Sequence, residues 1–215
     1  MNNRLQELLT KIRELEHELL LELQEKEKEY FYEILGKKVV FQEKIKKQNR
    51  RLAKTIHRYL RDASLLNILT VPVIWSCLLP ALFLDLVVSF YQMICFRVYS
   101  IPKVKRSDYI IIDRHYLSYL NLIEKINCCF CGYFNGLIGY VQEIAARTEQ
   151  YWCPIKHAHR SKMSHSRYNG FLDYGDGQGF RFNNSEIRHD FKDLDDKKNE
   201  SKKEDKAGDI DGRLL

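Results

Sequence analysis

The sequence predicts a mainly α-helical protein attached to a membrane, and three features support this. A long apolar run occupies residues 65–96, a helical leucine pattern precedes it, and a cluster of cysteines and histidines follows it. We therefore expect four consecutive parts. These are a coiled-coil-like helical arm at 1–63, a membrane-embedded helix or hairpin at 64–97, a small helical Cys/His domain at 98–182 and a charged, disordered tail at 183–215.

The charge of the chain is modest in sum but unevenly placed. Its net value is +6, from 35 basic and 29 acidic residues. Basic residues flank the apolar run on both sides, which is typical of a segment at an anionic membrane surface. No recognised nucleic-acid module accompanies these charges, so the lipid bilayer is the expected partner and nucleic acid is not. The apolar run also begins too late for a cleavable signal peptide.

The first 35 residues read as one long helix. Its apolar seam alternates steps of three and four and consists of Leu5, Leu8, Ile12, Leu15 and Leu19. Such a seam either self-associates or docks a protein partner as a coiled coil, or packs within an intramolecular helical hairpin that closes at residues 36–38. Fewer than three clean heptads are present, so both alternatives stay open. A second helix, cationic and amphipathic, is expected over residues 39–63.

The apolar run is longer than the roughly 20 residues that cross a bilayer. It contains Pro72, Pro80 and Asp85. It predicts either a single kinked span over about 68–86 or a re-entrant hairpin bent near Pro80. The basic flanks favour the hairpin. Asp85 either pairs with a basic residue or marks where the chain leaves the lipid, and we favour the second.

Further along the chain, the pattern predicts short elements and then a long helix. The aromatic and β-branched residues 109–113 indicate a brief strand, and residues 116–126 have helical spacing. A helix over Asn135–Trp152 should end before Pro154. Glu143 and Arg147, four positions apart, should pair on one face of that helix.

Four residues have a spacing that indicates a metal site: Cys128, Cys131, Cys153 and His157. Two thiolates in a tight turn bind one ion from adjacent positions, and a Cys and a His across a helix end supply two more ligands. This mixed donor set suits tetrahedral zinc. Gly132 would ease the tight turn. We expect the zinc ion to staple a small domain.

The same side chains allow other chemistry. Cys128 and Cys131 would serve as a redox dithiol, or with Cys153 as part of an iron–sulfur site. They would also serve as small buried apolar groups. In an enzyme, the acid–base candidates are Glu143, His115 and His157.

The sequence around the cysteines resembles a family of bacterial membrane-associated proteins. The shared core is Cys-x-x-Cys-x-Tyr-x-Asn-Gly-Leu, then Glu-Ile-Ala-Ala-Arg-Thr-Glu-Gln-Tyr-Trp-Cys-Pro-Ile-Lys-His-Ala, at residues 128–137 and 143–158. The resemblance covers about half of the chain and leaves out the N-terminal helices. Cys129 departs from the pattern, so it is not counted in the site. The resemblance implies bacterial origin and membrane attachment but no reaction.

These observations predict a membrane-attached interaction or scaffold module with a structural zinc-like Cys3His site. The alternative is a membrane-bound enzyme that uses the thiol or metal site for redox or hydrolytic chemistry. We expect it at the bacterial inner membrane, with the Cys/His domain on the cytoplasmic face.

Overall fold

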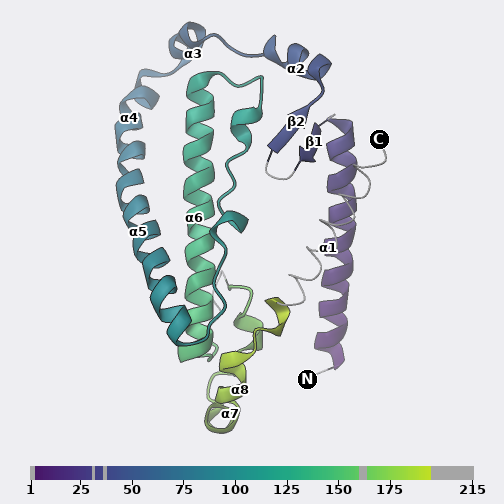
Figure 1. The fold of residues 1–215 in the computed structure, drawn as a ribbon, viewed down its shortest axis with the longest axis vertical. Helices are drawn as coiled ribbons and strands as arrows, with labels where there is room; N and C mark the ends of the chain where they lie inside the picture. Colours follow the sequence, from purple (N-terminus) through teal and green to yellow (C-terminus); the bar gives the residue numbers. More distant parts are fainter. Residues whose placement is uncertain (1–2, 31, 36–37, 160–163, 195–215) are drawn as a thin grey trace. The chain divides into compact units, whose positions relative to one another are not determined.

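The computed structural model describes residues 3–30, 32–35, 38–159 and 164–194 and is mainly helical (Figure 1). The helices are α1 (Asn3–Glu29), α2 (Glu43–Arg50), α3 (Ile56–Asp62), α4 (Leu65–Ser76), α5 (Leu78–Tyr91), α6 (Leu122–Trp152), α7 (Gly177–Phe182) and α8 (Asn184–His189). The strands are β1 (Tyr32–Leu35) and β2 (Lys38–Phe41).

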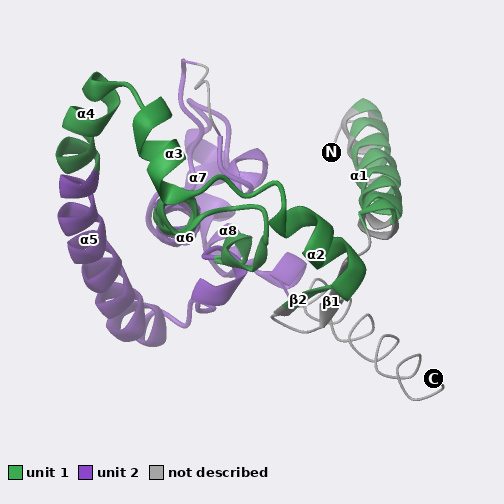
Figure 2. Cartoon of the chain, turned by 90° about the horizontal axis from the view of Figure 1, so that it is seen from above, with its two compact units in different colours: residues 1–74, 111–133 green, residues 75–110, 134–215 purple. Residues whose placement is uncertain are grey.

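The chain divides into two compact units (Figure 2). Unit 1 contains residues 1–74 and 111–133, and unit 2 contains residues 75–110 and 134–215. Each unit thus combines segments that are distant in the sequence, whereas the sequence analysis expected consecutive parts.

A β-hairpin interrupts the predicted N-terminal helices. Tyr32 pairs with Phe41, and Leu35 pairs with Lys38, in an antiparallel ladder. The predictions of helix over residues 32–35 and of one helix over 39–63 are therefore wrong. Tyr32, Ile34, Val39, Val40 and Phe41 are aromatic or β-branched, and such residues favour strands. Beyond β2, the predicted second helix is divided into α2 and α3. The coiled coil itself stays a prediction.

The apolar run forms one helix. α4, α5 and a π-helical turn at Gln92–Phe96 continue one another from Leu65 to Phe96, and this is the helix of the described chain that is long and apolar enough to cross a membrane. The predicted hairpin bend near Pro80 is therefore wrong. Pro80 lies in the first turn of α5, where a proline is tolerated.

One face of the helix from Leu78 onward is docked within unit 2. Its buried residues are Ala81, Asp85, Gln92 and Phe96. Large apolar side chains on the other faces are exposed: Leu79, Phe83, Leu86 and Phe90. The buried face of the helix therefore contains two polar residues, Asp85 and Gln92, while the large apolar side chains named above are exposed.

α6 is a continuous helix of 31 residues that ends directly before Cys153-Pro154, as predicted. The predicted strand at 109–113 is wrong, because this segment is irregular and none of its residues is in a strand. It packs on α6 at two glycines. A Cβ at Gly136 would lie 2.6 Å from the Tyr109 carbonyl oxygen, and one at Gly132 would lie 3.2 Å from the Ile111 carbonyl oxygen.

The last described segment follows α6. Gly175 has a φ of +91°, which favours glycine, and the Asp176 carboxylate accepts a hydrogen bond of 2.8 Å from the Gly179 N–H at the start of α7. Phe171 and Phe191 are buried in unit 2. Most of the predicted disordered tail, from residue 195 onward, lies outside the described residues.

Candidate functional site

The structure does not bring the four predicted zinc ligands together. Cys128 and Cys131 lie within α6 in unit 1, while Cys153 and His157 follow α6 in unit 2. The helix from Cys128 to its last residue is roughly 36 Å long at 1.5 Å per residue. In the described part of the chain, no group of three or more His, Cys, Asp or Glu side chains could hold a metal ion. Zinc binding therefore stays a prediction without structural support.

The expected metal-binding turn at Cys128–Gly132 is wrong, because these residues are helical. The sequence analysis assigned Gly132 to a turn. In the structure Gly132 and Gly136 instead provide space for the backbone of residues 109–111. A glycine after a Cys-x-x-Cys pair is equally compatible with close packing on a helix, and the sequence does not distinguish the two.

The two predicted catalytic histidines lie against aromatic rings. The His157 backbone N–H donates a hydrogen bond of 2.7 Å to the Tyr168 hydroxyl, and the His157 ring stacks on the Tyr168 ring. The His115 ring lies 4.0 Å from the Tyr116 ring, between their centroids. Both contacts suit a structural role.

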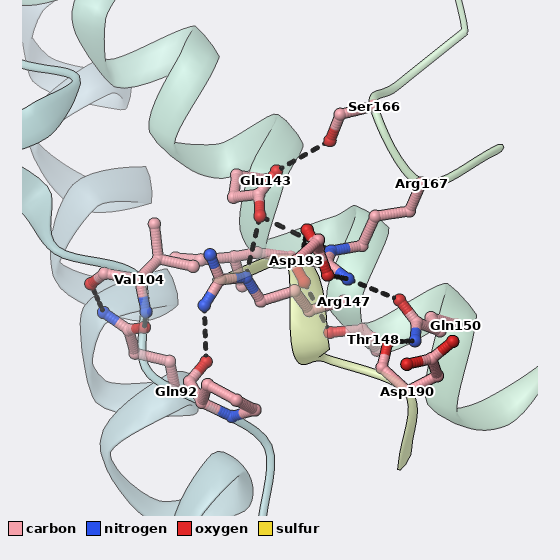
Figure 3. A network of polar contacts seen from close by, with 12 residues as sticks. Gln92, Val104, Glu143, Arg147, Thr148, Gln150, Ser166, Arg167, Asp190 and Asp193 are labelled. Carbon is pink, nitrogen blue, oxygen red and sulfur yellow. Dashed lines mark hydrogen bonds and ion pairs between the residues drawn. The ribbon is translucent and has the colours of Figure 1, made fainter. Parts of the chain in front are cut away.

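The third candidate, Glu143, is at the centre of a buried ionic network in unit 2 (Figure 3). The Arg147 Nε donates a hydrogen bond of 2.8 Å to Glu143, which confirms the predicted pair. The Arg167 Nε lies 3.6 Å from the same carboxylate oxygen. The Ser166 hydroxyl donates a longer hydrogen bond of 3.4 Å to the other oxygen.

Arg167 connects this network to the C-terminal part of unit 2 (Figure 3). Its guanidinium donates a hydrogen bond of 2.8 Å to the Gln150 side-chain oxygen and one of 3.2 Å to the Asp193 carboxylate. The Gln150 amide in turn donates to the carbonyls of Ile187 and Asp190, at the end of α8. The Arg167 side chain is only 6% exposed, so these contacts replace most of its hydration.

A histidine and a carboxylate form a second pair near the end of α6. The His165 Nε2 lies 3.0 Å from a Glu149 carboxylate oxygen, and the His165 ring packs against Tyr168 and Phe171. A carboxylate fixes the orientation of an imidazole. This pair combines a histidine and a carboxylate, two groups that commonly act as acids and bases in enzymes.

A further set of polar contacts joins the apolar helix to α6 and to the loop that follows the apolar helix. The Gln92 amide donates to the Val104 carbonyl, and its oxygen accepts a hydrogen bond of 3.0 Å from the Val104 N–H (Figure 3). The same amide also donates to the Tyr140 hydroxyl. The Arg106 guanidinium donates 2.7 Å to Asp85. The Arg106 side chain is half exposed, so Asp85 pairs with a basic residue that still reaches solvent.

The phenol of Tyr109 lies near the ionic network. Partial burial, and secondly the negative charge of Glu143, raise its pKa above the ordinary value of 10.0. Tyr109 therefore stays neutral at physiological pH.

Comparisons with known proteins add no relative. No family model, curated protein or solved structure matches this chain. The family resemblance seen in the sequence therefore stays an expectation, and the function has to be argued from the contacts.

The described geometry accounts for residues that the sequence did not single out. His165 and Arg167 lie in the segment after α6, and their partners Glu149 and Gln150 lie near the end of α6, so no local spacing connects them. Only the i, i+4 spacing of Glu143 and Arg147 was visible beforehand. Because Arg147 and Arg167 both lie against Glu143, and Arg167 also pairs with Asp193, the network holds α6 to the segments that follow it.

Proposed function

We propose that this chain is a membrane-attached scaffold, in which the helix Leu65–Phe96 provides the attachment and unit 2 provides a rigid body for interactions. The observation that supports the proposal most is the distribution of polar groups on this helix. Its polar residues Asp85 and Gln92 are buried against protein, while Leu79, Phe83 and Phe90 are exposed. Water would solvate this surface poorly, and hydrocarbon would cover it favourably.

The ionic network supplies the rigidity that the proposal needs. Buried pairs such as Glu143–Arg147 depend on precise geometry, because any loss of a partner leaves a buried charge. They link α6 to the segments that contain Arg167 and Asp193.

We assign residues after 97 to the cytoplasmic side of a bacterial inner membrane. This assignment is supported by Cys128, Cys129 and Cys153, which form no disulfide, because reduced thiols persist in a reducing compartment. Cys131 and Cys153 are exposed. An impermeant thiol reagent should therefore label them only after cell lysis; labelling of intact spheroplasts would refute this side assignment.

Membrane attachment is tested by carbonate extraction of membranes from cells that express the full chain. The wild type should stay in the pellet. Leu79→Lys combined with Phe83→Lys places two charges on the exposed face. Each lysine should raise the free energy of membrane insertion by about 3 kcal/mol, so this double variant should move into the supernatant.

A matched control places the same charges outside this helix. Tyr174 and Phe182 are 70% and 82% exposed, so Tyr174→Lys with Phe182→Lys should leave the protein in the pellet. Equal release of both double variants, or a wild type that is extracted, would contradict membrane attachment through this helix.

A further inference from the structure

We infer that α1 pairs with α1 of a second copy of this chain in an antiparallel coiled coil. The inference does not depend on membrane attachment. α1 has 27 residues, which corresponds to a length of about 40 Å. Its seam residues are half exposed or more, at 51% for Leu8, 51% for Ile12, 63% for Leu15 and 59% for Leu19. A helix with an exposed leucine seam and many charged residues outside it is typical of a coiled-coil strand.

The direction of pairing follows first from Glu22. The heptad that places Ile12 and Leu19 at a places Leu15 and Glu22 at d. In a parallel dimer, d faces d, so the two Glu22 carboxylates would meet in the seam. In an antiparallel dimer, d faces a, and Glu22 faces the apolar Leu5 position of the other copy. Repulsion between two carboxylates thus disfavours the parallel arrangement.

The flanking charges indicate the same direction. The g positions are Arg4, Lys11, Glu18 and Glu25, and all four are exposed. Antiparallel helices place g beside g of the partner, because the flanks of one helix run in reverse along the other. This brings Lys11 beside Glu18 and Arg4 beside Glu25, and two-fold symmetry repeats each attractive contact. A parallel dimer would bring g beside e and offer only Lys11 beside Glu16 as an attractive contact.

The test uses charge reversal in the full chain, purified in mild detergent at low salt. Light scattering over a range of concentrations gives the dimer dissociation constant. Glu18→Lys turns two attractive contacts per dimer into repulsive ones and should raise this constant about tenfold. Adding Lys11→Glu restores opposite charges and should restore the wild-type constant. The control Glu14→Lys makes the same charge change at an exposed position on the outer face and should have no effect.

Each alternative gives a different result. A parallel dimer would be weakened by Glu16→Lys and not by Glu18→Lys, and this outcome would overturn the inference. A dimer held by other surfaces would be insensitive to both substitutions and to Leu15→Asp. A wild type that is monomeric at all concentrations, with the helix content of α1 intact by circular dichroism, would also overturn the inference.

Discussion

Replacing Gly136 by alanine tests the packing of residues 109–111 on α6. The new Cβ would lie 2.6 Å from the Tyr109 carbonyl oxygen and 2.8 Å from the Ile110 Cα. Both are backbone atoms, so no side-chain rotation relieves the contact. Overpacking costs about 1–3 kcal/mol, and the upper value applies to a rigid neighbour. Alanine returns about 1 kcal/mol of helix propensity. The net free energy of unfolding should fall by about 2 kcal/mol.

Two other glycines of the same helix are matched controls. A Cβ at Gly139 would meet only a ring carbon of Tyr109, at 3.3 Å, so Gly139→Ala should change stability by less than about 1 kcal/mol. A Cβ at Gly132 would meet the Ile111 carbonyl at 3.2 Å, so Gly132→Ala should fall between the two.

The assay has two readouts on the full chain in mild detergent. Chemical denaturation followed by circular dichroism gives the free energy of unfolding. Trypsin gives the local readout, because Arg106 and Arg114 flank the segment, and in Gly136→Ala it should cleave there faster than in the wild type. Equal stability and cleavage for Gly136→Ala and Gly139→Ala would refute the packing of residues 109–111 against Gly136.

Further predictions concern the ionic network, Asp85, pH and metal. Glu143→Gln leaves Arg147 buried without its carboxylate and should lower the free energy of unfolding by about 3 kcal/mol, measured by chemical denaturation. The control Asp108→Asn removes an exposed pair with Lys105 and should lower the free energy of unfolding by less than about 1 kcal/mol. Asp85→Asn should cost about 1 kcal/mol in the same assay, because half of the Arg106 side chain stays in solvent. The raised pKa of Tyr109 means that the unfolded chain ionises first, so stability should decline as pH rises above about 10, and Tyr109→Phe should weaken that decline in pH-dependent denaturation. Elemental analysis of detergent-purified protein should find much less than one zinc per chain, and Cys153→Ser should keep the wild-type helix content by circular dichroism.

The sequence predicted the features that depend on neighbouring positions. The helical class, the apolar helix, the end of α6 before Pro154 and the Glu143–Arg147 pair all follow from local spacing or from a run of similar residues. Proline geometry and the helical repeat act over a few residues, so one sequence contains enough information for them.

The errors arose where distant segments decide the outcome. The Cys-x-x-Cys pair and Gly132 were predicted to form a turn. In the structure they are helical, and the absence of a side chain at Gly132 and Gly136 lets the backbone of residues 109–111 approach α6 closely. The apolar run read as a hairpin because basic residues lie on both flanks, yet the α-helical geometry continues through Pro80. The contacts of Arg167 with Gln150 and Asp193 join separate segments and have no local signal.

The interleaved order of the two units has a consequence for biosynthesis. Residues 75–110 leave the ribosome before residues 134–194, yet Gln92 finds Tyr140 only in the later segment. The apolar helix is thus synthesised first, with Val104, and the Gln92 amide lacks its second acceptor, the Tyr140 hydroxyl, until α6 has been made. Nascent chains stalled before residue 134 should expose this helix to chaperones or to the insertion machinery, and no single cut of the chain yields either unit whole.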